Sequence, residues 1–339
     1  MGLKLMHCSA IVLLVSGLVI SACISQSPAG PPEMTTVKVA NIPTTSNGPL
    51  FIAQEEGYFA RQGINVEWEK FPGVAAALPL LVSGDIAVSA GPLTPGLINA
   101  IAKGANVRIV AEKGRVAAGD CTPTALVVRR DLYEKGLIRN VSDLKGRKIM
   151  AISDQDYGIF RALSLGNLTK ADVELIDMDF ASGVIAFRNK GIDAAVLTEP
   201  YITQALNSGS VVVLIRGEEI YPDYPYALYY GPAILDRDPD LGRRFMIAYL
   251  QGVHQYNEGK TERNLEILQN YTHLDRELLN QSCLYPVARD GNLPWKPVDE
   301  YLEWMYANKK IAQKLEENQL FDRSYLTYAN AAVQNMTRG

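Results

Sequence analysis

The stretch VKVANIPTTSNGPLFIAQEEGYFARQGINVEWEK, residues 37–70, contains the pattern that decides the fold. Its first four residues are typical of a short strand. Pro49 to about Arg61 predicts a helix, because Pro lies in its first turn and Gly63 lies just beyond its end. From Ile64 to Glu69, apolar and polar residues alternate as in a half-buried strand. The stretch therefore predicts a strand, a helix and a second strand in succession.

The alternation of strands and helices continues along the chain and then repeats. A helix over residues 75–81 and a strand over residues 86–88 complete the first series. The second series has strands over residues 147–152, 173–176 and 194–196, and helices over residues 159–165 and 183–190. Because such alternation favours a parallel sheet covered by helices, we predict an α/β fold with two parallel-sheet lobes.

A proline-containing turn follows the third strand of each series. The two turns are Gly91-Pro92-Leu93-Thr94 and Thr198-Glu199-Pro200-Tyr201. Ligands of open α/β sheets bind beyond the carboxyl ends of the strands, where such turns lie. Two facing lobes would therefore place both turns around one ligand cleft.

The chain after about Tyr229 changes to a run of predicted helices. They cover residues 241–256, 262–271, 275–284, 298–308 and 324–336. No linker-like segment precedes them, so we expect them to pack on the first lobe and not to form a third domain.

The N-terminal residues have the features of a secretory signal peptide. The apolar run over residues 8–22 is too short to span a bilayer with confidence, and Lys4 supplies positive charge ahead of it. ISAC, residues 20–23, resembles a bacterial lipobox, in which the thiol receives diacylglycerol before cleavage ahead of it. We predict a signal peptide over residues 1–22, then a lipidated Cys23 and a flexible tether over residues 23–36. The alternative is a plain secretory signal, with Cys23 merely near the cleavage site.

The composition describes a globular protein with a sizeable core. Hydrophobic residues make up 47% of the chain, charged residues make up 21%, and the formal net charge is -4. This balance excludes the basic surface that nucleic-acid binding requires, and no later apolar run is long enough to cross a membrane. Apart from Cys8 and Cys23, the cysteines are Cys121 and Cys283, and the sequence leaves open whether these two form a disulfide or stay free thiols.

Short segments along the chain carry a resemblance to a known family. They are FIAQEEGYF (51–59), QGINVE (62–67), LVSGDIAV (81–88), ALVVRRDL (125–132), DLKGRK (143–148), TEPY (198–201) and YLQGV (249–253). In the same order along nearly the whole mature chain, they resemble solute-binding lipoproteins of the sulfonate, nitrate, taurine and thiamine-precursor type. Those proteins have the class II periplasmic-binding-protein fold and deliver solutes to ABC importers. The resemblance is specific for the family and not for the ligand.

The resemblance implies two lobes around a cleft, with the chain crossing between them near residues 121–125 and 221–229. Lobe 1 would comprise residues 37–123 and 227–339, and lobe 2 would comprise residues 124–226. It also implies a lipid-anchored monomer on the outer face of the cytoplasmic membrane. Such a receptor closes on its solute by a hinge motion and passes the solute to an ABC permease beside it.

The candidate ligand contacts lie in the loop after the first strand of each lobe and in nearby turns. They are Thr45, Ser46, Asn47, Gly73, Val74, Thr94, Asp154, Asp156, Tyr157, Glu199 and Tyr226. Hydroxyl, amide and backbone N–H groups near helix starts can receive an anion or a polar group. The alternatives are ordinary capping and turn chemistry for the loop residues and Glu199, and hinge or core packing for the tyrosines.

Two carboxylates in the second loop bear on the type of ligand. Asp154 and Asp156 would repel a sulfonate or phosphate unless Arg115 or Arg161 offset them. An aromatic nitrogen heterocycle of the pyrimidine or flavin-precursor type suits them better, and the tyrosines between residues 221 and 230 could stack on it. The sequence therefore slightly favours the heterocycle and keeps an alkyl sulfonate as the alternative.

The sequence gives little support for catalysis, so we expect neither an enzyme nor a bound metal or cofactor. The mature histidines, His254 and His273, lack metal-ligand spacing, and GKT at residues 259–261 lacks the strand and spacing of a P-loop. No Gly-x-Ser-x-Gly or paired-cysteine zinc motif occurs. A related enzyme of pyrimidine-precursor synthesis depends on a histidine and a cysteine-rich segment that this chain lacks. The alternatives to a transport receptor are a ligand-sensing module of a signalling receptor and, less favoured, such a synthase.

Overall fold

The computed structural model describes residues 34–41, 44–71, 73–117, 119, 121–151 and 156–336. The predicted signal peptide, Cys23 and Asp154 lie outside these residues, and so does the side chain of Asp156. Strand β1 (Thr35–Asn41) begins inside the segment expected as a tether, because Thr35 pairs with Ile64 of β2 (Ile64–Lys70). The predicted tether is therefore too long at its C-terminal end.

Five strands form the first sheet in the order β2-β1-β3-β10-β4. Its other members are β3 (Val88–Pro92), β4 (Arg108–Val116) and β10 (Tyr224–Tyr230). β1 runs parallel to β2 and β3, whereas β10 is antiparallel to both of its neighbours, β3 and β4.

Five strands also form the second sheet, in the order β7-β6-β8-β5-β9. They are β5 (Thr124–Arg129), β6 (Lys148–Ala151), β7 (Glu174–Asp177), β8 (Ala194–Thr198) and β9 (Val211–Arg216). β6 is parallel to β7 and β8, whereas β5 is antiparallel to β8 and β9.

Both sheets are mixed, so the prediction of parallel sheets is wrong for one strand of each. In each sheet the antiparallel strand is the first one after the chain crosses from the other sheet. β5 follows β4, and β10 follows β9 and the short helix α9 (Gly217–Ile220). A strand that enters directly from the other sheet runs against the strands that helical crossovers have made parallel.

Helices connect the strands as the sequence predicts, with one break. The single helix expected from Pro49 to about Arg61 is two helices, α1 (Gly48–Glu55) and α2 (Tyr58–Arg61), because Gly57 takes a φ of 70° between them, and the 3-10 turn η1 (Thr45–Asn47) precedes α1. The other elements are α3 (Val74–Ser83), α4 (Pro95–Ala102), α5 (Arg130–Glu134), η2 (Val141–Leu144), α6 (Asp156–Ser164), η4 (Lys170–Asp172), α7 (Phe180–Arg188) and α8 (Tyr201–Asn207).

The C-terminal helices pack chiefly on the first sheet, as expected. They are α10 (Pro232–Leu235), α11 (Pro239–Tyr256), α12 (Glu262–Thr272), α13 (Arg276–Gln281), α14 (Trp295–Ala307), α15 (Glu317–Leu320) and α16 (Ser324–Met336). α11 contacts α1, α2 and α16, and α14 contacts β10. Gly252 lets α11 approach the Pro49 carbonyl so closely that any side chain there would collide with it. Within the described ranges, no helix is long and apolar enough to span a membrane.

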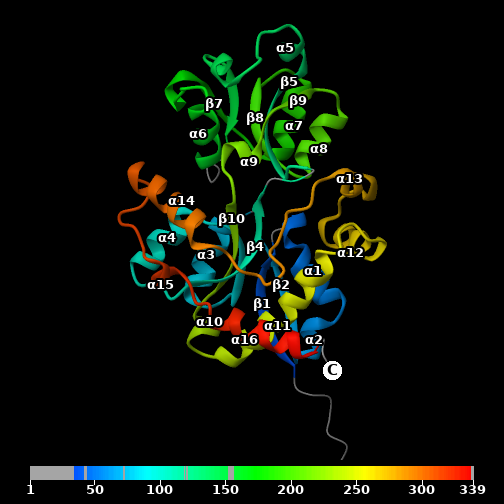
Figure 1. Cartoon of the computed structure of the whole chain (residues 1–339), viewed down its shortest axis with the longest axis vertical. Helices are drawn as coiled ribbons and strands as arrows, with labels where there is room; N and C mark the ends of the chain where they lie inside the picture. Colours follow the sequence, from blue (N-terminus) through cyan, green and yellow to red (C-terminus); the bar gives the residue numbers. More distant parts are fainter. Residues whose placement is uncertain are drawn as a thin grey trace, which may run out of the picture. The chain divides into compact units, whose positions relative to one another are not determined.

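The first sheet is buried on both faces, as Figure 1 shows with α3, α4 and α14 on one side and α1 and α11 on the other. The segment of β10 is apolar throughout because both faces of this strand are covered. Ala227 and Tyr229 belong to one buried cluster, and Leu228 and Tyr230 belong to the other. A strand covered on both faces loses the alternation of a half-buried strand.

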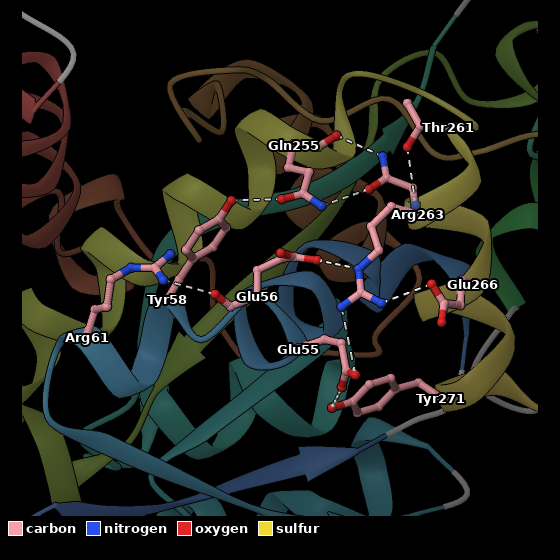
Figure 2. A network of polar contacts seen from close by, with 10 residues as sticks. Glu55, Glu56, Tyr58, Arg61, Gln255, Thr261, Arg263, Glu266 and Tyr271 are labelled. Carbon is pink, nitrogen blue, oxygen red and sulfur yellow. Dashed lines mark hydrogen bonds and ion pairs between the residues drawn. The ribbon is translucent and has the colours of Figure 1, made fainter.

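A surface network fastens α12 and α11 to the first two helices (Figure 2). Arg263 of α12 lies 2.7 Å from the Glu56 carboxylate and 3.0 Å from that of Glu266. The Tyr58 hydroxyl donates to Gln255 Oε1 of α11 at 2.7 Å. Because these charges are solvent-exposed, their ion pairs orient α12 against α1 but add little to the free energy of unfolding.

Candidate ligand-binding site

The carboxyl ends of β1 and β3 lie at one edge of the first sheet, beside the start of β10. Asn41 ends β1, and Pro92, which ends β3, pairs with Tyr226 of β10. Tyr226 also pairs with Gly114 near the end of β4. The segments that follow β1 and β3 lead into η1 and α4, so this edge gathers the candidate residues of the first lobe.

The loop after β1 buries all three of its candidate residues in η1. Thr45, Ser46 and Asn47 are buried, and Ser46 lies within hydrogen-bond distance of the Thr44 hydroxyl at 3.0 Å. The hydroxyl of Thr45 and the side-chain oxygen of Asn41 are buried without a hydrogen-bond partner among the described residues. Such groups are costly unless something binds them, so this loop has capacity for a polar ligand.

Two further candidates lie at helix starts. Gly73 is the extended residue before α3, and the Val74 side chain fills the space where any side chain on Gly91 of β3 would lie. The start of α3 therefore packs directly on the end of β3. Thr94 is buried and accepts the Leu97 N–H at 3.2 Å, so its side chain caps α4, which is the alternative that the sequence left open.

Tyr157 is the described side chain of the second-lobe loop, since Asp154 and the Asp156 side chain lie outside the described residues. Its ring centroid lies 4.6 Å from that of Tyr301, 4.8 Å from Trp304 and 5.6 Å from Tyr224. α6 of the second lobe thus meets α14 and β10 through aromatic rings. Burial raises the pKa of the Tyr157 hydroxyl, which therefore stays protonated and can donate a hydrogen bond.

Tyr226 belongs to the same group of rings but is more deeply buried. It packs edge-on against Tyr224 at 5.6 Å and against Tyr285 at 5.2 Å. Packing of this kind is the alternative that the sequence gave for the tyrosines. A ligand-contacting role for Tyr226 stays a prediction.

Glu199 is 6% exposed and directs its carboxylate to protein donors. Its oxygens accept the N–H and the hydroxyl of Thr203 at 3.2 and 2.9 Å, and the N–H of Cys283 at 3.1 Å. Burial raises the pKa of Glu199, and these hydrogen bonds oppose that rise. The residue caps α8 and ties the turn after β8, which contains a cis peptide bond to Pro200, to the C-terminal part of the chain.

Cys121 and Cys283 form a disulfide, with Cα atoms 5.7 Å apart across a sequence separation of 162. The question that the sequence left open is thereby answered in favour of the bond. Cys121 lies in the first crossing between the sheets, and Cys283 follows α13. The Tyr285 hydroxyl donates to the Pro123 carbonyl at 3.2 Å, so the same two segments are held together twice.

Lys113 of β4 is a functional candidate that sequence reasoning missed. It is 3% exposed, and burial lowers the pKa of its ammonium group to about 7. The signal was present in RIVAEKGRV, residues 108–116, where a lysine interrupts a strand that proves buried along most of its length. No group of three or more His, Cys, Asp or Glu side chains suited to a metal occurs in the part of the chain that the structure describes.

Residues 30–267 match the profile of the NMT1-like family. The chain belongs to this family. The taurine-binding periplasmic protein of Escherichia coli (strain K12) is 26% identical over 171 residues, which is 50% of each chain. The riboflavin-binding protein RibY of Chloroflexus aurantiacus is 21% identical over 263 residues, which is 70% of each chain.

Solved structures share the fold. The nitrate-binding protein NrtA of Synechocystis PCC 6803 superposes with a TM-score of 0.72 at 16% identity, over 90% of both chains. The aliphatic sulphonate binding protein SsuA of Escherichia coli gives 0.67 at 17% identity, over 86% of this chain and 92% of that one. The predicted class II periplasmic-binding-protein fold is confirmed. The relatives named above are binding proteins, in agreement with the prediction of a binding protein and not an enzyme.

Proposed function

We propose that the chain captures a small organic solute between its two lobes and closes on it by a hinge motion. The predicted lobes are residues 37–123 with 227–339, and residues 124–226, but β10 of the first sheet begins at Tyr224, so residues 224–226 belong to the first lobe. The chain is the solute-binding component of an ABC importer and works outside the cytoplasm, as its family and fold indicate. Its work is binding and closure, without covalent chemistry.

The aromatic rings between the two lobes are the observation that carries this proposal. Tyr157 comes from the second lobe, and Tyr224, Tyr301 and Trp304 come from the first lobe and its C-terminal helices. These rings contact one another in this structure, so a flat solute would stack between them only after the lobes open, with the Tyr157 hydroxyl as a donor. The unpartnered oxygens of Thr45 and Asn41 at the sheet edge supply polar contacts.

The rings support an aromatic nitrogen heterocycle of the pyrimidine or flavin-precursor type, with an alkyl sulfonate as the alternative. Both chemistries occur among similar chains, since one relative binds riboflavin and another binds taurine. We expect the protein to act as a monomer that hands its solute to an ABC permease.

Thermal unfolding of the purified mature protein tests this function. The panel contains pyrimidines, flavins, aliphatic sulfonates, nitrate and aromatic acids. A true ligand at 100 times its dissociation constant should add about 2.7 kcal/mol to the free energy of unfolding, which gives a clear midpoint shift. Tyr157→Ala should weaken a heterocycle about tenfold, whereas Tyr328→Ala, a change at an exposed ring of α16, should not.

The outcomes separate the parts of the proposal. A shift with one heterocycle and none with sulfonates supports both the receptor and the stacking role of Tyr157. A shift with sulfonates alone keeps the receptor and removes the heterocycle. Silence across the panel contradicts the proposed solute classes and favours a sensing module with another ligand.

Anchoring through Cys23 is a separate proposal that rests on the ISAC motif at residues 20–23. The wild-type protein should incorporate labelled palmitate in a bacterial host and sediment with membranes. Cys23→Ser should lose the label and appear in the released fraction. Equal labelling of both proteins would contradict lipidation at Cys23.

A further inference from the structure

Lys113 is a buried cation that the protein does not neutralise. It is 3% exposed, and burial is the sole cause of its lowered pKa, with no contribution from a nearby carboxylate. Within the described ranges, its ammonium group has no hydrogen-bond or ion-pair partner. Buried lysines are otherwise paired, so an unpaired one requires an explanation.

The neighbouring carboxylate is committed to other partners. Glu112 Oε1 lies 2.8 Å from Arg115 Nη1, and its Oε2 accepts the backbone N–H of Ala288. Arg115 also lies 3.8 Å from Asp223. Glu112, Arg115 and Asp223 therefore neutralise one another, and within the described residues neither carboxylate forms an ion pair with Lys113. The other titratable groups on elements packed against β4, or bonded to it, are Tyr224, Tyr226, Tyr229, Tyr230, Tyr249, Tyr285, Arg289, Asp290, Glu317, Asp322, Tyr325 and Tyr328.

Lys113 precedes Gly114, which pairs with Tyr226, so it lies at the edge of the first sheet that gathers the candidate residues. The pairing of β4 with β10 passes from Gly114–Tyr226 to Glu112–Ala227, which leaves Lys113 without a partner residue in β10. Irregularities of this kind redirect side chains and are common beside functional sites. η1 packs against β4 and carries the unpartnered hydroxyl of Thr45.

A helix begins next to this edge and adds to its affinity for negative charge. α1 continues directly from η1, since the N–H of Gly48 donates to the Thr45 carbonyl and Pro49 has no N–H; its first turn therefore favours an anion through the helix dipole and not through free N–H groups. The Lys113 ammonium group, the unpartnered Thr45 hydroxyl and the positive end of the α1 dipole thus lie on adjacent elements. An acidic group is the chemistry that would satisfy all of them.

We propose that Lys113 supplies the positive charge that binds an acidic group of the solute, with the Thr45 hydroxyl as a further donor and the dipole of α1 adding to the attraction. The acidic group is a sulfonate, a carboxylate or a phosphate. The inference rests on the proposed function and narrows it, since uncharged heterocycles are excluded and acid-bearing solutes remain. It also opposes the preference that the sequence drew from Asp154 and Asp156.

Calorimetric titration with matched probes tests the charge. The pairs are ethanesulfonate with ethanesulfonamide, nicotinate with nicotinamide, and riboflavin 5′-phosphate with riboflavin. The proteins are the mature wild type, Lys113→Met and a control, Lys103→Met, which removes the same charge from an exposed position. Lys113→Gln is the second variant if the methionine protein does not fold.

A second measurement needs no organic ligand. The thermal midpoint of each protein is compared in sodium sulfate and in sodium chloride at equal ionic strength. General salt effects act on all the proteins alike, so a difference between wild type and Lys113→Met reports an anion at this site. The control variant should follow the wild type.

We expect wild type and Lys103→Met to bind the acid of at least one pair tenfold or more tighter than its amide or alcohol, and Lys113→Met to lose that preference. A preference that survives Lys113→Met, or tight binding of uncharged probes alone, overturns the inference and leaves the proposed function standing. If no organic probe binds, a sulfate shift that depends on Lys113 supports the anion site against the proposed solute classes. The absence of that shift then overturns the inference.

Discussion

Glu199 and Lys113 are both buried charged side chains, and their surroundings are opposite. The Glu199 carboxylate accepts hydrogen bonds from two groups of Thr203 and from Cys283. Lys113 is buried more deeply, and its ammonium group has no partner in the part of the chain that the structure describes. A buried charge that the protein satisfies holds the structure together, whereas one that it leaves unsatisfied is available to a ligand.

The two residues also differ in the segments of the chain that they bring together. Glu199 joins the turn after β8 to the segment after α13, where the Cys121–Cys283 disulfide makes a second link. Lys113 lies in β4, a strand that contacts η1 in the loop after β1. Changes around Glu199 should therefore lower the free energy of unfolding, whereas changes around Lys113 should weaken the binding of the solute.

The largest loss of stability should follow removal of the disulfide beside Glu199. The double change Cys121→Ser and Cys283→Ser should lower the free energy of unfolding by about 4 kcal/mol, because the bond closes a long loop in the unfolded chain. Guanidinium unfolding measures the loss, and reduction of the wild type with dithiothreitol should reproduce it. A loss below about 1 kcal/mol would show that the hydrogen bonds of Glu199 and Tyr285 suffice.

Glu199→Ala should cost about 3 kcal/mol, since it leaves the buried N–H of Cys283 and both groups of Thr203 without their acceptor. Urea unfolding measures this cost. Glu174→Ala, at a side chain that is 57% exposed, is the matched control and should be nearly neutral. If Glu199→Ala lowers the free energy of unfolding no more than Glu174→Ala does, the contrast with Lys113 is wrong, because the hydrogen bonds of Glu199 then contribute nothing.

The pH dependence of the free energy of unfolding tests whether Lys113 lacks a partner in the folded protein. The pKa of Lys113 is about 7 in the folded protein and about 10.5 in the unfolded chain, so the unfolded chain binds more protons between these values. The free energy of unfolding of the ligand-free wild type should therefore rise above pH 7, relative to Lys113→Met, by about 1.4 kcal/mol per pH unit. Denaturant titrations at pH 7, 8 and 9 measure the difference. Parallel curves for the two proteins would mean that Lys113 is already satisfied.

The smallest effect is expected where charge is exposed. Arg263→Ala removes contacts with Glu56 and Glu266 and should lower the free energy of unfolding less than any other destabilising change, and less still in 0.5 M salt. Urea unfolding at two salt concentrations measures it. A cost as large as that of Glu199→Ala would show that the network in Figure 2 carries more of the packing of α12 than its exposure suggests.

Part of the order of elements could be predicted from the sequence because hydrophobic period and punctuation are local, but the strands β4, β5, β9 and β10 were not predicted. Residues 324–336 form a helix as predicted, and the alternation of residues 64–69 is that of β2. The direction of β5 and β10 could not be predicted this way. It depends on where the chain crosses between sheets, and no local pattern encodes that.

The candidate site could be predicted only in outline. The loops and turns follow from the carboxyl ends of the strands, but the state of each side chain depends on distant segments. Lys113 is adjacent to the charged Glu112 in sequence and would pass for a solvent-exposed pair. Residues 286–291 cover the edge of β4 through bonds to Glu112 and Arg115, and they come from the far end of the chain. Likewise, Cys283 reaches Glu199 only through tertiary packing.

The place of β10 between β3 and β4 fixes an order of assembly. As the chain is made and exported from its N-terminus, the first sheet has a gap in its middle until residues 224–230 emerge. The strands of the second sheet, β5 to β9, are contiguous in the chain and can pair before that point. The inserted lobe is therefore the part that can form first, and the lobe that contains β1 is completed last.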